Sequence, residues 1–341
     1  MFNNSTKIMF YSTLFAGILL VMSANSWMGA WMGLEINLLS FIPIMINNQN
    51  IYTTESSMKY FLIQSLASSI LLFSIMIMMM MEKNNNIIMK SNNNIIILIP
   101  LLLKSGVSPF HWWFPSVMEG LNWMNCFILM TLQKMGPMIL MLNVMKISLW
   151  MMFIIILSIM VGSIGGLNQL STRKMMTYSS INHMGWLMTA MLISKNLWMI
   201  YFIIYTMLAG MITSLMKINK ISFINQTFLI NNNPIFKFLL ITVMLSLSGL
   251  PPFIGFLPKW IIIQLMIDNN LIIIGTLMII FSLITLYYYL RISYSLLLMS
   301  YMEMNWMLNY YSNNNLMFNS FLCMMSTMGM LLMSLLLSIC L

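Results

Sequence analysis

Four ionisable side chains lie well inside apolar stretches of the sequence, where a membrane-spanning helix would otherwise carry leucine. They are Glu35, Lys104, Lys134 and Lys259. A charged side chain at the centre of a bilayer costs about 2.5–3.5 kcal/mol on insertion scales, so such residues are candidates for function by default. Taken singly, each could instead be a helix-end residue that extends to the lipid headgroups, or half of a structural ion pair.

The chemistry that these four groups offer is proton transfer. Removal from water disfavours the charged forms of both lysine and glutamate, so each can exchange a proton near neutral pH. Two charges about 8 Å apart at an effective dielectric of about 20 interact by about 2 kcal/mol. Movement of Glu35 relative to Lys104 can therefore switch the protonation of the lysine. Three lysines in series can pass a proton, or the repulsion that ejects one, along the membrane plane.

Helix-breaking residues adjoin two of the lysines. The stretch Ser105-Gly-Val-Ser-Pro-Phe110 follows Lys104. A similar stretch, Ser248-Gly-Leu-Pro-Pro-Phe253, comes shortly before Lys259. Proline has no N–H, so the helix loses a backbone hydrogen bond, and interrupted backbone at membrane depth is tolerated only inside protein or beside a water-filled cavity. The sequence therefore predicts two broken helices that do not face lipid and whose free carbonyl groups can order water.

A histidine follows the first lysine of this set. His111 lies seven residues after Lys104, and two turns of unbroken helix span about 10 Å. Imidazole exchanges protons near neutral pH, which suits a relay between the lysine and the membrane surface. A structural histidine that is hydrogen-bonded to the broken backbone fits the sequence equally well.

The composition identifies a polytopic membrane protein. Of 341 residues, 60% are hydrophobic and only 6% are charged, whereas soluble domains carry about 25% charged residues. The net charge of +9 then reflects lysines in loops rather than nucleic-acid binding. The three cysteines are scattered and have neither disulfide nor metal-site spacing. No glycine-rich nucleotide motif is present, so we expect no metal and no cofactor in this chain.

Methionine and asparagine usage indicates where the chain is encoded. There are 45 methionines, and asparagine occurs in runs such as Asn84–Asn86 and Asn313–Asn315. An AT-rich genome that reads ATA as methionine produces this bias, which is the animal mitochondrial code. The sequence therefore predicts a mitochondrially encoded protein of the inner membrane.

The apolar pattern predicts an all-α protein with about eleven transmembrane helices. The expected spans are residues 6–22, 27–46, 58–81, 95–118, 123–143, 148–169, 175–193, 197–217, 236–266, 271–294 and 317–340. Eight loop-proximal Lys or Arg residues fall on the side of the N-terminus and four on the other side, which predicts an N-terminus in the matrix. The broken helices are the fourth and ninth spans, so the second copy of a five-helix repeat would be inverted. We expect one membrane domain made of repeat 1 (about 6–143), repeat 2 (about 148–294) and one extra helix (about 317–340).

Four stretches around the charged residues resemble the antiporter-like subunits of respiratory complex I. They are Met32-Gly-Leu-Glu-Ile-Asn-Leu38, Leu103-Lys-Ser-Gly-Val-Ser-Pro-Phe-His-Trp-Trp-Phe-Pro-Ser-Val-Met-Glu-Gly120, Leu132-Gln-Lys-Met-Gly-Pro137 and Leu247-Ser-Gly-Leu-Pro-Pro-Phe-Ile-Gly-Phe-Leu-Pro-Lys-Trp260. The resemblance extends over nearly the whole chain. It departs from the wider family, which has fourteen core helices, at the start of the chain. There we expect the first three helices of that family to be missing, and the charged residues are unaffected by this difference.

The resemblance implies a role in NADH:ubiquinone reductase, the proton-translocating complex. Its antiporter-like subunits translocate protons with a glutamate and lysines, which correspond by motif to Glu35, Lys104, Lys134 and Lys259. NADH, flavin mononucleotide, iron–sulfur clusters and ubiquinone are then expected in partner subunits, with no redox chemistry in this chain. The implied partners are other membrane-arm subunits, including further antiporter-like subunits, and membrane lipids.

Two other functions compete with this one. A stand-alone cation/proton antiporter would need a cation site, and the sequence offers no additional carboxylate cluster inside a span. A purely structural membrane-arm scaffold would have no need of four charges inside spans, since each lowers stability.

Overall fold

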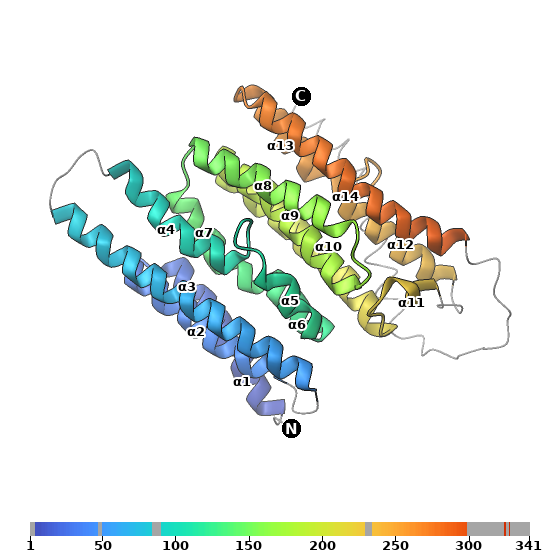
Figure 1. The fold of residues 1–341 in the computed structure, drawn as a ribbon, viewed down its shortest axis with the longest axis horizontal. Coiled ribbons are helices and arrows are strands. Elements are labelled where there is room, and N and C mark those ends of the chain that lie inside the picture. Colours follow the sequence, from blue (N-terminus) through green and yellow to red (C-terminus); the bar gives the residue numbers. More distant parts are fainter. Residues whose placement is uncertain are drawn as a thin grey trace. The chain divides into compact units, whose positions relative to one another are not determined.

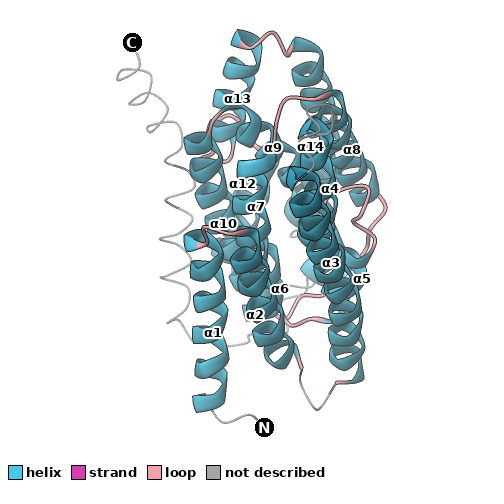
Figure 2. Ribbon diagram, turned by 90° about the vertical axis from the view of Figure 1, so that its left-hand side faces the viewer, coloured by secondary structure: helices cyan, strands magenta, loops and turns pink. Residues whose placement is uncertain are grey.

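The computed structural model describes residues 4–46, 50–83, 90–228, 234–298 and the single residues 324 and 327. In these ranges the elements are α-helices, as Figures 1 and 2 show, and one isolated β-bridge pairs Ser171 with Phe223. The chain divides into two compact units, Met1–Met151 (unit 1) and Met152–Leu341 (unit 2).

Unit 1 packs around its last helix. Its helices are α1 (Asn4–Ser23), α2 (Trp27–Met45), α3 (Ile51–Lys83), α4 (Lys90–Ser105), α5 (Trp113–Gly120), α6 (Trp123–Met130) and α7 (Leu132–Val144). Helix α7 contacts α1, α2, α4 and α6, while α3 contacts α2, α4 and α5. The broken pair α4–α5 is therefore covered by α3 and α7.

Unit 2 packs around α9. Its helices are α8 (Leu149–Gly166), which begins at the unit boundary, α9 (Thr172–Ile193), α10 (Lys195–Ile218), α11 (Ile224–Phe228), α12 (Pro234–Ser248), α13 (Phe256–Asp268) and α14 (Ile272–Leu298). Helix α9 contacts α10, α13 and α14. It is buried along most of its length although it carries Ser179, Ser180, Asn182 and His183. An interior helix covered by protein can carry polar groups that a lipid-facing helix cannot.

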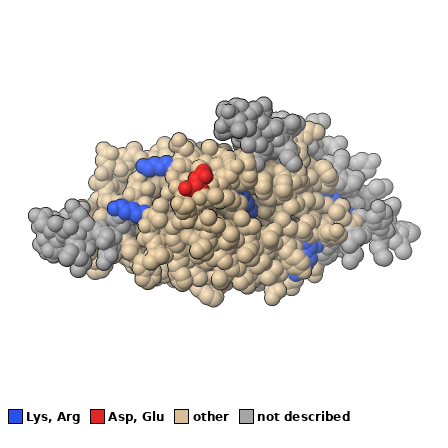
Figure 3. Space-filling view, turned by 90° about the horizontal axis from the view of Figure 1, so that it is seen from above, with Lys and Arg blue, Asp and Glu red and all other residues tan. Residues whose placement is uncertain are grey.

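Seven helical segments in the described ranges are long and apolar enough to cross a membrane, and α6 and α7 together form one of them. They comprise residues 5–23, 27–45, 51–80, 123–144, 149–166, 195–218 and 272–294. Charged side chains are few among the uncharged residues on the face that Figure 3 shows. The prediction of an all-helical, multi-pass membrane protein is confirmed.

Both predicted helix breaks are present. Helix α4 ends at Ser105 and α5 begins at Trp113, while α12 ends at Ser248 and α13 begins at Phe256. Each break begins with a glycine in the left-handed region, Gly106 at φ +71° and Gly249 at φ +84°. Glycine adopts this conformation without the steric cost that a Cβ brings, which explains the Ser-Gly pair in both stretches.

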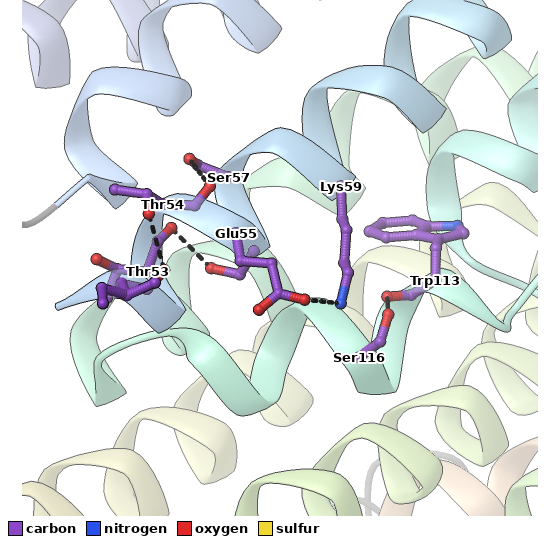
Figure 4. A network of polar contacts seen from close by, with 9 residues as sticks. Thr53, Thr54, Glu55, Ser57, Lys59, Trp113 and Ser116 are labelled. Atoms are coloured by element: carbon purple, nitrogen blue, oxygen red, sulfur yellow. Dashed lines mark hydrogen bonds and ion pairs between the residues drawn. The ribbon is translucent and has the colours of Figure 1, made fainter.

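Three features differ from the sequence prediction. Helix α3 begins at Ile51 rather than near residue 58, because a polar first part precedes the apolar span. This part is buried on one side, at Thr53, Ser56 and Ser57. In that part Lys59 Nζ donates to Glu55 Oε1 at 2.6 Å, one helical turn apart, and Figure 4 shows the pair near Trp113.

The other two differences concern later helices. Thr131 interrupts the expected single helix between α6 and α7, and the short helix α11 was not expected. The predicted span 317–340 lies outside the described residues, apart from 324 and 327.

Substitution of Gly255 by alanine tests the packing of the second break. A Cβ at Gly255 would overlap the carbonyl oxygen of Ser246, and backbone cannot move aside as a flexible side chain can. We expect Gly255→Ala to lower the free energy of unfolding by about 1–3 kcal/mol, as overpacking does elsewhere. The measurement is the midpoint of thermal aggregation in detergent.

The control is Gly275→Ala, since a Cβ there would meet Met266 Sδ at 3.9 Å, an ordinary contact. Equal midpoints for the two variants would contradict the described geometry of the break.

Candidate functional site

Lys104 lies in the last turn of α4, where the helix ends in a tight hydrogen-bonded cap. The N–H of Gly106 donates to Leu103 O at 3.3 Å, and the N–H of Val107 donates to Leu102 O at 3.2 Å. This is the pattern of a Schellman motif, which satisfies two of the carbonyls that a helix end leaves open. A cation in the last turn also interacts favourably with the negative end of the helix dipole. Lys104 is thus buried, at 7% exposure, where the backbone stabilises its charge.

Further donors reach the end of α4 from outside the helix. Gln64 Nε2 on α3 donates to Lys104 O at 3.3 Å. Trp113 Nε1 at the start of α5 donates to Leu103 O at 3.1 Å. Two carbonyls in the last turn of α4 therefore accept hydrogen bonds from side chains of α3 and α5, which fixes the position of the lysine-bearing turn.

Lys134 lies on the first turn of α7 and is 2% exposed. Its ammonium nitrogen lies 4.5 Å from the centroid of the Phe114 ring. A cation over an aromatic face is stabilised by about 0.5–2 kcal/mol, more when water is excluded. The helix that follows the first break therefore contributes a partner for this second lysine.

Lys104 and Lys134 line the same cavity inside unit 1. The cavity has about 20 Å³ of space for water, and its other polar lining residues are Asn37, Tyr60, Gln64, Ser105 and Gln133. A cavity needs about 10–15 Å³ to hold one water molecule. The space between the two lysines is therefore polar and large enough for a water.

Glu35, on α2, is half-buried and interacts electrostatically with Lys104. Its Oε2 atom is buried without a hydrogen-bond partner. It is not among the residues that line the cavity. A carboxylate that lacks direct hydrogen bonds at one oxygen influences the lysine mainly through its charge.

His111 lies within the break and is 7% exposed. Its ring stacks on Trp112, with centroids 5.1 Å apart and an interplanar angle of 27°. Trp112 is 81% exposed, so the histidine is next to the surface of unit 1. It does not line the cavity that Lys104 and Lys134 share.

In unit 2, Lys259 follows its helix break instead of preceding it. Its Nζ donates to Ser248 O at 2.9 Å, across the break from α13 to the end of α12. The same nitrogen lies 5.8 Å from the ring centroid of Trp186 on α9. Lys259 is 5% exposed, so water has little access to its Nζ atom. The open carbonyl at the end of α12 serves as its hydrogen-bond acceptor instead.

The two breaks have the same pattern of backbone hydrogen bonds. Gly249 N donates to Ser246 O at 3.1 Å and Leu250 N to Leu245 O at 3.4 Å, which repeats the cap of α4. Phe110 N donates to Val107 O at 2.8 Å, and Phe253 N donates in the same way to Leu250 O at 3.0 Å. The similarity of the two sequence stretches is thus accompanied by the same local structure.

Sequence reasoning missed the uncharged polar residues around the lysines. Asn37, Tyr60, Gln64 and Gln133 are all on the cavity wall. Asn37 is two residues from Glu35, and Gln133 precedes Lys134, so amides next to charges within an apolar span were the available signal. Among the described residues, no group of three His, Cys, Asp or Glu could hold a metal ion.

Comparison with known proteins identifies relatives over nearly the full length. A family model described as "NADH:quinone oxidoreductase/Mrp antiporter, TM" matches residues 24–286. NADH-ubiquinone oxidoreductase chain 2 of Aedes aegypti is 51% identical, with 96% of each chain covered. The protein of that name from Locusta migratoria is 44% identical, with 97% of each chain covered. The sequence also resembled, among the antiporter-like subunits, chain 2 of an insect, and these relatives confirm both the family and that resemblance.

A solved structure has a similar fold. A chain in the structure of respiratory complex I from Thermus thermophilus with bound aureothin superposes with a TM-score of 0.83 at 19% identity. The match covers 96% of this chain and 78% of that chain. At this level of identity, the likeness shows the fold.

Chemical labelling of lysines tests the burial of the three site lysines. We expect an amine-acylating reagent to modify Lys104, Lys134 and Lys259 at least about tenfold more slowly than exposed Lys195. The reaction requires local opening of the bundle, and each 1.4 kcal/mol of opening free energy lowers the rate about tenfold. Peptide mass spectrometry after timed labelling gives the rates. Labelling of the three at the rate of Lys195 would show that they are not buried as described.

Proposed function

The chain belongs to the NADH:quinone oxidoreductase/Mrp antiporter transmembrane family, and we propose that it is a core membrane-arm subunit of respiratory complex I. In this role it takes part in proton translocation across the mitochondrial inner membrane, coupled to NADH oxidation by ubiquinone. The observation that carries the proposal is the pair of buried lysines, Lys104 and Lys134, which share one water-sized polar cavity beside a helix break.

In the proposed mechanism, Glu35 controls the charge of Lys104. The carboxylate favours the protonated lysine while the two groups are near, and separation of the two removes that support. Lys104 can then pass its proton, through water in the shared cavity, to Lys134. His111 serves as a relay between the break and the surface of unit 1. No covalent step and no cofactor within this chain is required.

Lys259 supplies the corresponding proton site in unit 2. Its hydrogen bond to Ser248 O stabilises the charged form in the resting arrangement. A change at the break that removes this acceptor would promote release of the proton. The three lysines and Glu35 are therefore assigned to proton translocation, and His111 to a relay.

The proposed architecture has about eleven spans, as two inverted five-helix repeats and one further helix. Repeat 1 would correspond to about residues 6–143 and repeat 2 to about 148–294, and the apolar sequence of residues 317–340, which lies almost wholly outside the described residues, predicts the last span. The matching caps at Gly106 and Gly249 support a repeat. The excess of Lys and Arg on one side supports an N-terminus in the matrix.

The proposed partners are the other membrane-arm subunits, including further antiporter-like subunits, together with membrane lipids. NADH, flavin, iron–sulfur clusters and ubiquinone are assigned to those partners and not to this chain. A structural scaffold remains the competing function, and the cost of burying three lysines argues against it.

Proton pumping in vesicles tests the proposal. We expect Lys104→Met to lower the number of protons pumped per NADH oxidised, or the rate, while complex assembly on a native gel is unchanged. Methionine keeps the length of the side chain and removes its charge. Lys195→Met, at an exposed position at the start of α10, is the matched control. Wild-type pumping in an assembled Lys104→Met complex would favour the scaffold.

A further inference from the structure

Two polar residues on α3, one turn apart, each hold a segment that carries a site lysine. Tyr60 Oη donates to Gln133 Oε1 at 3.1 Å, and Gln133 is the residue before Lys134 on α7. Gln64 Nε2 donates to the carbonyl of Lys104 itself at 3.3 Å. Residues four apart on a helix lie on the same face, so one face of α3 reaches both segments.

The chain of hydrogen bonds continues to the helix that carries Glu35. Gln133 Nε2 donates to Asn37 Oδ1 on α2 at 3.0 Å. Because Tyr60 donates to the oxygen of Gln133, the NH₂ group of that amide must point to Asn37, and the orientation of each group is fixed. Tyr60, Gln133 and Asn37 thereby connect α3, α7 and α2 around the cavity.

These groups are buried, so their hydrogen bonds are not replaced easily by water. Tyr60 and Asn37 are each 2% exposed and Gln64 is 5% exposed. Leaving a buried polar group unpaired costs more than the bond itself contributes. The hydrogen bonds of Tyr60 and Gln64 therefore fix the positions of the segments that carry Lys134 and Lys104.

We propose that Tyr60 and Gln64 are positioning residues that set the separation of Lys104 and Lys134 around a water molecule in the shared cavity. The inference rests on the proposed function, since it concerns how the two lysines exchange a proton. Neither residue exchanges the proton itself. Because transfer through one water requires both nitrogens within hydrogen-bond reach of it, a shift of either segment would interrupt the transfer.

The test uses Tyr60→Phe and Gln64→Met in the assembled complex. Each variant keeps the approximate size of the side chain and removes the polar group that makes the hydrogen bond, the hydroxyl of Tyr60 or the amide of Gln64. Tyr52→Phe is the matched control, because Tyr52 is also on α3 and is 77% exposed. The measurements are assembly on a native gel and the pH profile of proton pumping in vesicles.

A hydrogen bond of average strength corresponds to about a fivefold change in an equilibrium. We therefore expect pumping near neutral pH to fall about fivefold in both variants, and the midpoint of the pH profile to move by about 0.7 unit. Tyr52→Phe should retain the wild-type rate and midpoint. A purely structural role would lower the amount of complex without moving the midpoint.

Wild-type pH profiles in assembled Tyr60→Phe and Gln64→Met complexes would overturn the inference. This holds whether or not Lys104→Met lowers proton pumping. Wild-type pumping in Lys104→Met would overturn the proposed function instead, so the two failures are distinguishable. If one of the α3 variants does not assemble, the pH profile of the other decides.

Discussion

The structure depends on one constraint: a buried ammonium group needs hydrogen-bond acceptors. Inside a helical bundle neither water nor lipid supplies them. Three lysines with 2–7% exposure lie inside helical bundles. Unbroken helices have no free backbone acceptors in their interiors, so the bundle provides helix ends instead. The glycines and prolines of the two breaks create those ends at the depth where the lysines lie. The helix breaks and the buried charges are therefore parts of one arrangement.

The two units satisfy this constraint in different ways. Lys259 donates a hydrogen bond directly to the open carbonyl of Ser248. Lys104 and Lys134 share a water-sized cavity, and Lys134 is stabilised further by the face of Phe114. A direct bond holds a proton in place, whereas a polar cavity allows it to move. This difference agrees with a transfer step within unit 1 and a more firmly held proton site in unit 2.

The sequence predicted the helix class, both breaks and the burial of the lysines, because these follow from local features. Gly106 and Gly249 each follow the last residue of a helix in the left-handed conformation, which glycine adopts at little cost. A lysine within an apolar run is buried together with that run. The amide and phenol groups around the cavity could not be predicted, because they are contacts between distant residues. Tyr60 meets Gln133 across 73 positions and Asn37 meets Gln133 across 96. Periodicity within one helix carries no information on such pairs.

The most direct test of the central claim is a double-mutant cycle of Glu35→Gln and Lys104→Met, with pumping rates measured in assembled complexes. If the carboxylate acts through the charge of the lysine, the loss in the double variant should equal the larger single loss, since removal of Lys104 leaves Glu35 with nothing to control. If the free-energy losses of the two single variants add in the double variant, the two groups act independently, and the proposed coupling between them is wrong.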